Sequence, residues 1–125
     1  ELLKICDVIS LHCPLTDDTR DLIGMRELGL MKSSAILINT ARGGLVDSAA
    51  LVEALGSGVI AAAGIDVLSH EPPVNGDPLL DYRGDNLIVT PHIAWATVEA
   101  RQNAINEVAA NVRSFLSGEE RNRVV

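Results

Sequence analysis

The segment Ala35-Ile36-Leu37-Ile38-Asn39-Thr40-Ala41-Arg42-Gly43-Gly44 joins an apolar run of strand length to polar residues and two glycines. An apolar run without polar alternation is typical of a parallel strand that is buried on both faces of its sheet. Runs of the same kind occupy residues 7–13, 61–68 and 87–90. The sequence therefore predicts four parallel strands, with the quoted segment forming the second strand over residues 35–41 and the loop that follows it.

Segments with helical periodicity alternate with these strands. Residues 25–31 have the pattern of a short helix, and residues 47–55 that of a longer helix, capped by Asp47 and ended at residues 56–58. The longest helical pattern runs over residues 97–116, while the proline-rich residues 71–78 are expected to form one long loop. The alternation predicts an α/β fold with about four parallel strands, flanking helices and a long C-terminal helix.

Composition excludes several classes of protein. Seventeen acidic residues against ten basic residues give a net charge of −7, which argues against nucleic acid or an anionic membrane as partners. Charged residues recur too often for a membrane-spanning segment. The two cysteines form no paired motif and no targeting signal opens the chain, so a cytoplasmic location is expected. The chain begins with glutamate and is expected to be a fragment.

Four side chains able to perform chemistry follow the predicted strands. Residues that follow parallel strands converge at one edge of the sheet, where ligands bind in open α/β folds. We therefore expect a guanidinium, two carboxylates and an imidazole to lie at the same edge. These residues are Arg42, Asp66, Glu71 and His92.

Each of these residues also has a structural explanation. A lone histidine is more often structural than catalytic, and a loop glutamate is most often a solvated surface group. If Glu71 accepts a hydrogen bond from the ring of His92, however, its charge favours the imidazolium and creates a proton donor that works near neutral pH. His12 is expected to be packed within a strand, and His70 to lie exposed in a loop.

Arg42 and Asp66 are the other two candidates. A guanidinium pairs with a carboxylate through two hydrogen bonds, and the glycines at 43 and 44 would let an anionic ligand approach the backbone. The alternative for Arg42 is a surface arginine beside a glycine turn. Asp66 should cap backbone amides or accept from a ligand amide, because a buried carboxylate without partners is unfavourable. No spacing of histidine or cysteine indicates a metal site.

Several motifs resemble the D-isomer-specific 2-hydroxyacid dehydrogenase family. They are residues 39–47, Gly64-Ile65-Asp66-Val67 with Glu71-Pro72, Pro91-His92-Ile93, and the opening residues 7–16. Residues 91–97 are most similar to the glycerate dehydrogenase, or hydroxypyruvate reductase, branch. The resemblance implies the C-terminal part of a Rossmann-type NAD-binding domain over residues 1–96. It also implies that residues 97–125 lead back towards a substrate domain.

The resemblance implies roles for individual residues. Arg42 would anchor the substrate, Glu71 would partner the catalytic histidine, and His92 would donate and accept the proton. The residues implied to contact NAD or NADP are Cys13, Pro14, Thr40, Ala41, Arg42, Asp66, His92 and Ala94. The implied reaction is hydride transfer between NAD(P)H and a small 2-keto acid such as hydroxypyruvate or glyoxylate, in a homodimer. The residues that decide between NAD and NADP lie outside this sequence.

Two other interpretations fit the same sequence. Members of the family carry a glycine-rich dinucleotide-binding turn and most of a substrate domain before the segment seen here, so the 125 residues alone are expected to be inactive. One alternative is a nucleotide-sensing or corepressor-like interaction module on the same fold. The other is a truncated product without a function.

Overall fold

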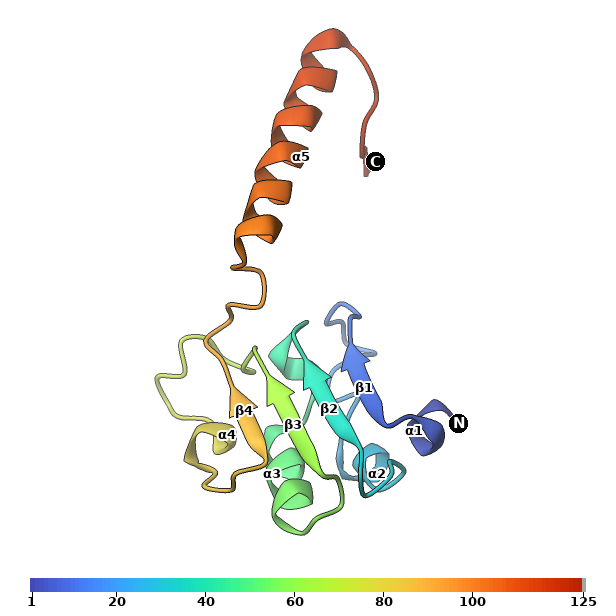
Figure 1. Ribbon diagram of the computed structural model, residues 1–125, viewed down its shortest axis with the longest axis vertical. Helices are drawn as coiled ribbons and strands as arrows, with labels where there is room; N and C mark the ends of the chain where they lie inside the picture. Colours follow the sequence, from blue (N-terminus) through green and yellow to red (C-terminus); the bar gives the residue numbers. More distant parts are fainter. Residues whose placement is uncertain (125) are drawn as a thin grey trace. The chain divides into compact units, whose positions relative to one another are not determined.

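The computed structural model describes residues 1–124 (Figure 1). The residues group into two compact units, Glu1–His92 and Ile93–Val125. The first unit contains the sheet, and the second contains the long helix. The domain boundary expected after residue 96 remains a prediction.

The first unit is built on a parallel sheet of four strands. These are β1 (Val8–Leu11), β2 (Ile36–Asn39), β3 (Ala62–Ile65) and β4 (Leu87–Val89), and they lie side by side in that order. The prediction of an α/β fold with four parallel strands is confirmed, although each strand is shorter than the apolar run that predicted it. The reason is that the apolar pattern reports burial rather than strand pairing: Val67 is buried in the loop beyond β3.

The four strands end at the same level. Leu11 pairs with Asn39, Asn39 with Ile65, and Ile65 with Val89. Because the strands are parallel, the residues that follow them leave the sheet at one edge, at the tips of the arrows in Figure 1. This register places the loops after β2, β3 and β4 next to one another.

Short helices precede and connect the strands. They are α1 (Leu2–Ile5), α2 (Met25–Leu28), the 3-10 helix η1 (Gly43–Leu45), α3 (Ser48–Gly56) and α4 (Pro78–Asp81). Asp47 caps α3 as predicted, since its Oδ1 accepts the N–H groups of Ala49 and Ala50 at 3.0 and 3.1 Å.

Helix α4 is absent from the sequence-based prediction, which made the end of this segment a loop. Asp77 caps α4 by accepting the Leu79 N–H at 3.0 Å, and Pro78 occupies the first turn. A capping aspartate followed by proline is a helix-start signal. The preceding prolines hid that signal, because they extend the loop up to the cap.

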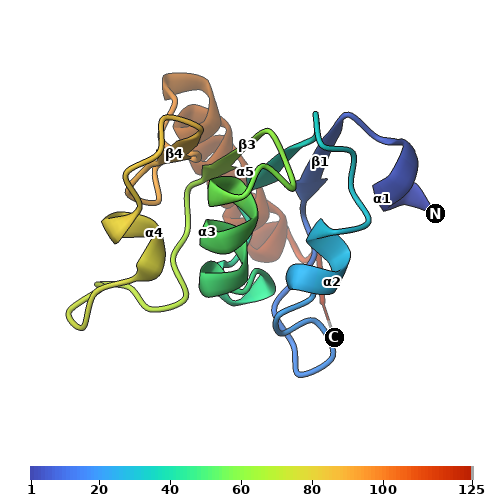
Figure 2. The same ribbon diagram turned by 90° about the horizontal axis from the view of Figure 1, so that it is seen from below.

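Only one face of the sheet is covered within the first unit. Ile9, Leu37 and Ile65 on the covered face are each at most 5% exposed, whereas Val8 and Ile88 on the other face are 57% and 68% exposed. Helices α2 and α3 lie on the same side of the strands in Figures 1 and 2. The expectation that the strands are buried on both faces is therefore wrong for residues 1–92. Aliphatic composition does not reveal that successive helices return to the same face.

The second unit contains helix α5 (Val98–Ser117), as the sequence predicts. Thr97 Oγ1 accepts the Ala100 N–H at 3.1 Å, and Gly118 ends the helix in the left-handed conformation with a φ of 76°. No residue of α5 is buried, and Trp95 before it is 60% exposed. Among the described residues, no helix is both long and apolar enough to cross a membrane.

Candidate active site

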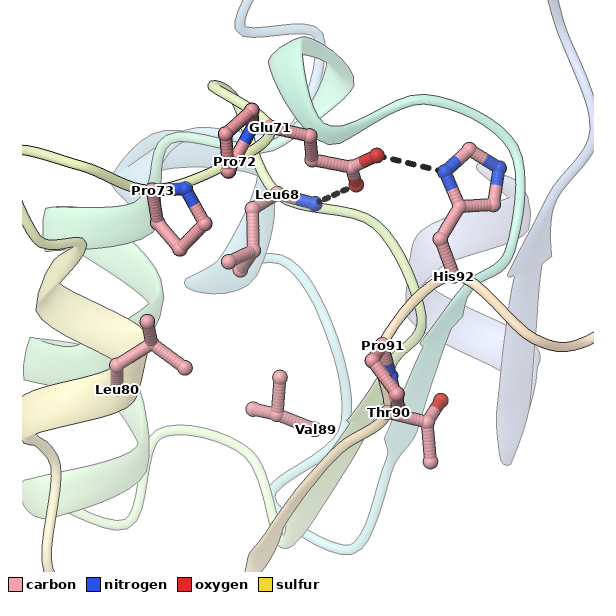
Figure 3. A pocket seen from close by; sticks show the side chains of 9 residues that line it. All are labelled: Leu68, Glu71, Pro72, Pro73, Leu80, Val89, Thr90, Pro91 and His92. Carbon is pink, nitrogen blue, oxygen red and sulfur yellow. Dashed lines mark hydrogen bonds and ion pairs between the residues drawn. The ribbon is translucent and has the colours of Figure 1, made fainter.

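A hydrogen-bonded pair of side chains lies beyond the ends of β3 and β4. His92 Nδ1 is 2.6 Å from Glu71 Oε2, and Glu71 Oε1 accepts the Leu68 N–H at 2.8 Å (Figure 3). Both carboxylate oxygens of Glu71 are thus engaged. The contact on which the sequence argument for a proton donor depended is present in the structure.

The backbone of His92 is held in an uncommon conformation. Its φ of 55° is left-handed, a region in which histidine, asparagine and aspartate are over-represented among residues with side chains. The His92 N–H is shared between the Asp66 carbonyl at 2.8 Å and the Thr90 carbonyl at 3.0 Å. The end of β3 therefore anchors the turn that presents the imidazole. Such conformations persist where the surroundings determine them, often at functional sites.

The Glu71–His92 contact has an electrostatic consequence. The hydrogen bond from His92, assisted by the Leu68 N–H, holds the pKa of Glu71 below its usual value of 4.5. Glu71 is therefore ionised at neutral pH and can only accept hydrogen bonds, so the proton lies on His92 Nδ1. Proton exchange with a ligand then falls to Nε2, the other ring nitrogen of His92.

An apolar cavity of about 390 Å³ lies beside this pair (Figure 3). The side chains that line it include Leu68, Pro72, Leu80 and Val89. The imidazole and carboxylate are nevertheless partly open to solvent, with 43% and 35% of their side-chain areas exposed. The pair thus lies at the rim of this cavity, accessible from outside.

The loop after β2 packs directly against the loop that carries Glu71. A Cβ added to Gly43 would lie 2.0 Å from the carbonyl carbon and oxygen of Leu68. Glycine is therefore required here by the protein's own backbone. This corrects the expectation that the glycine at 43 leaves room for a ligand: Leu68 occupies that space, and the two loops are locked together.

Arg42 itself contacts its own loop. Its Nη1 donates to the Ala41 carbonyl at 2.6 Å. Arg42 and Ala41 also line an open cavity of about 670 Å³ together with residues from the loop after β1. The other lining residues are His12, Cys13, Pro14 and Leu15.

This cavity brings together four of the residues implied to contact the cofactor, namely Cys13, Pro14, Ala41 and Arg42. His12 was expected to be packed within a strand, but β1 ends at Leu11. His12 is exposed, and its Nε2 lies 2.8 Å from Ser10 Oγ. The run over residues 7–13 continues past Leu11, the last paired residue of β1, so the strand predicted from it is too long.

Asp66 follows β3 and is 4% exposed. Its Oδ1 accepts a hydrogen bond of 2.5 Å from Thr90 Oγ1, and its N–H donates to the Asn39 carbonyl at 2.9 Å. A buried carboxylate at the carboxyl end of a strand can accept further hydrogen bonds from a ligand amide. It therefore suits the carboxamide of a nicotinamide ring.

Two implied cofactor contacts lie outside these groups. Thr40 is exposed directly after β2 and is not among the residues that line the cavity next to Arg42. Ala94 belongs to the second compact unit, so its contact with a cofactor remains a prediction. Between residues 1 and 124, no group of three or more His, Cys, Asp or Glu residues could hold a metal ion.

Sequence reasoning missed residues that support the site rather than perform its chemistry. The Leu68 N–H orients Glu71, Thr90 binds Asp66, and the Gly43 backbone contacts Leu68. The side chain of Asn39 is fully buried below the Arg42 loop. The position of Asn39, a polar residue at the end of an apolar run, was a signal in the sequence that could have indicated its supporting role. Long-range backbone contacts leave no such signal.

The chain is similar to known dehydrogenases over most of its length. Residues 1–94 match the family described as "D-isomer specific 2-hydroxyacid dehydrogenase, NAD binding domain". Over 123 residues the chain is 54% identical to the glycerate dehydrogenase of Methylorubrum extorquens, covering 98% of this chain and 39% of that protein. Over 118 residues it is 48% identical to the glyoxylate reductase of Aeropyrum pernix, covering 94% and 35%.

The fold is also that of a solved member of this group. The NAD-complexed D-isomer specific 2-hydroxyacid dehydrogenase of Lactobacillus delbrueckii ssp. bulgaricus matches with a TM-score of 0.83 and 35% identity, covering 98% of this chain and 40% of that one. The chain thus spans well under half the length of these relatives, and the Rossmann-type fold is confirmed for the part that it contains. From the family match and the shared fold, we conclude that the chain belongs to the D-isomer specific 2-hydroxyacid dehydrogenase family and that most of it is NAD-binding domain.

Proposed function

We propose that this chain supplies the acid–base half of an NAD(H)-dependent dehydrogenase that interconverts a small 2-keto acid and the corresponding D-2-hydroxy acid. The observation that carries the proposal is the 2.6 Å contact between Glu71 and His92 at the carboxyl ends of parallel strands. The Arg42 loop, which packs against the Glu71 loop through Gly43, supports it. The names of the relatives favour hydroxypyruvate or glyoxylate as the keto acid.

Each charged residue has a task in the reduction of the keto acid. Arg42 binds the substrate carboxylate through its planar guanidinium. His92 Nε2 donates a proton to the carbonyl oxygen as that oxygen gains negative charge, while Glu71 holds the proton on Nδ1 and stabilises the imidazolium. In the reverse direction, neutral His92 accepts the proton of the hydroxyl group.

The residues present fit a nicotinamide cofactor. Asp66 offers a buried acceptor, and the cavity next to Arg42 is lined by Cys13, Pro14 and Ala41. Bound NADH supplies the hydride that the carbonyl carbon requires. We therefore assign Asp66, Arg42 and these three residues to cofactor binding. Thr40, His92 and Ala94 are further proposed contacts that rest on the resemblance to the family.

The working enzyme in this proposal is a longer polypeptide. The chain corresponds to 39% of the glycerate dehydrogenase and 35% of the glyoxylate reductase that it resembles. The remaining length would supply the other part of the cofactor site and a substrate domain, so the 125 residues alone should be inactive. We also propose that this longer protein is a cytoplasmic homodimer, which sedimentation of the purified protein and cell fractionation would test.

The test replaces His92 by a residue that tolerates the same backbone. Asparagine is favoured in the left-handed region, so His92→Asn removes the imidazole with little effect on the turn. In the full-length protein, turnover of hydroxypyruvate and glyoxylate should fall by about 10²–10⁴-fold. The affinity for NADH, followed by fluorescence titration, should fall far less than turnover, because the other proposed cofactor contacts remain.

His70→Asn is the matched control, because His70 lies exposed in the neighbouring loop. It should leave turnover unchanged. Wild-type turnover in His92→Asn would contradict the proposal. Binding of NADH by the wild-type protein without turnover of any 2-keto acid would instead support a nucleotide-sensing module.

A further inference from the structure

Asn39 is the only asparagine or glutamine among the described residues whose side chain is fully buried. It is the last residue of β2, with an exposed fraction of 0%. An amide that is removed from water must find hydrogen-bond partners inside the protein, because an unpaired buried polar group is strongly unfavourable. The hydrogen-bond partners of the Asn39 side chain therefore indicate its structural role.

Both ends of the amide bind the loop that carries Arg42. Asn39 Oδ1 accepts the Ala41 N–H at 3.1 Å, and Asn39 Nδ2 donates to the Arg42 carbonyl at 2.9 Å. The two bonds also define the orientation of the amide, since a backbone N–H requires the oxygen and a carbonyl requires the nitrogen. The amide thus closes a tight turn between the end of β2 and Arg42.

The backbone of Asn39 extends this arrangement to the next strand. Its carbonyl accepts the Asp66 N–H at 2.9 Å, directly after the paired residues Asn39 and Ile65. Three hydrogen bonds of this one residue therefore end on Ala41, Arg42 and Asp66. All three belong to the candidate site, whereas Asn39 itself lies beneath that site.

We propose that Asn39 is a positioning residue that holds Arg42 for the substrate carboxylate; this rests on the proposed function of Arg42. The side chain must both accept and donate at a fixed separation. Aspartate has the same shape but no donor when ionised, leucine has neither group, and glutamine is longer by one methylene. Because the Asn39 side chain is fully buried, bulk solvent does not reach it to replace a lost partner, so the loop itself must shift.

The experiment is a double-mutant cycle in the full-length protein with Asn39→Asp and Arg42→Ala. Arg42→Ala should raise the KM for hydroxypyruvate by about 30-fold or more, because it removes one partner of a charged pair. Asn39→Asp should raise the same KM by about three- to tenfold, the effect of one lost hydrogen bond. In the Arg42→Ala background, Asn39→Asp should have almost no further effect on KM.

Leu37→Ala is the matched control. Leu37 lies two residues earlier on the same strand and the same face, and it is also fully buried. It should destabilise the fold without raising the KM for hydroxypyruvate. A merely structural role for Asn39 would make Asn39→Asp resemble Leu37→Ala, with effects additive to those of Arg42→Ala, and that result would overturn the proposal.

A second measurement needs no variant. In the wild-type protein the Ala41 amide should exchange slowly with deuterated solvent, because its acceptor is a buried side chain. Unprotected exchange at Ala41 would overturn the proposal even if Asn39→Asp failed to fold. An unchanged KM in Arg42→Ala would refute the anchoring role of Arg42 instead. A raised KM in Arg42→Ala with an unchanged KM in Asn39→Asp would refute the role of Asn39 alone.

Discussion

The candidate site has two halves, the Arg42 loop and the Glu71–His92 pair, and different interactions hold each of them in place. The Arg42 loop rests on the Asn39 amide, which is fully buried, and on a backbone contact at Gly43. The His92 and Glu71 side chains are joined by one hydrogen bond and remain 43% and 35% exposed. The Arg42 loop therefore depends on packing, and substitutions there should lower the stability of the fold. The Glu71–His92 pair depends on charge, and substitutions there should lower the rate of the reaction.

The largest effect on the packed half should come from Gly43→Ala. The new Cβ would lie 2.0 Å from the Leu68 carbonyl group, so the backbone of one loop has to move. We expect a loss of about 3 kcal/mol in the free energy of unfolding, measured by urea denaturation, together with loss of activity. Both loops should be affected, because Leu68 also orients Glu71.

Gly56→Ala provides the control for the added methyl group. Its Cβ would meet Tyr82 Cε2 at 3.9 Å, an ordinary contact. This variant should be as stable as the wild type or slightly more stable, because alanine favours the helix. Equal stability of the Gly43→Ala protein and the wild type would show that the loops are not locked together.

The exposed half should respond in turnover rather than in stability. Glu71→Gln keeps the shape of the side chain but removes the charge that stabilises the imidazolium. We expect kcat for keto acid reduction to fall about tenfold or more, because a neutral amide stabilises a positively charged ring less than a carboxylate does. Glu53→Gln, an exposed residue on α3, should leave kcat unchanged. A wild-type kcat in Glu71→Gln would remove Glu71 from the mechanism.

The smallest effect is the acid dependence of stability. The pKa of Glu71 is lowered in the folded protein, so the folded state binds fewer protons on this carboxyl than the unfolded chain. The interaction therefore stabilises the fold above the ordinary value of 4.5 and is lost as the pH falls through the lowered pKa. The stability difference between wild type and Glu71→Gln should therefore shrink as the pH falls through the lowered pKa of Glu71.

Urea denaturation from about pH 7 to about pH 3 measures this difference. Glu27→Gln is a useful comparison, because Arg26 lowers the pKa of Glu27 through a side-chain hydrogen bond far from the candidate site in sequence. It should show the same direction of acid dependence without any change in the pH profile of turnover. A stability difference for Glu71→Gln that grows in acid would contradict the assigned direction.

Much of the site was readable from the sequence because it follows from strand order. His92, Asp66 and Arg42 each come soon after an apolar run, and parallel strands in register carry such residues to one edge. The sequence places Glu71 and His92 at the same edge of the sheet, but it does not show whether the two side chains are in contact. Its geometry depends on the loop between β3 and β4, whose course is determined by capping at Asp77 and by backbone contacts.

Local patterns determined the elements of this protein: the aliphatic runs became β1 to β4, Asp47 became a helix cap, and Gly118 ended α5. They could do so because apolar runs, helix caps and helix-ending glycines are signals carried by residues close in sequence. Only the tertiary structure decided which sheet face is covered, that Leu68 fills the space beside Gly43, and that the Asn39 amide is fully buried. These features arise from contacts between distant segments, whose distances no local pattern encodes.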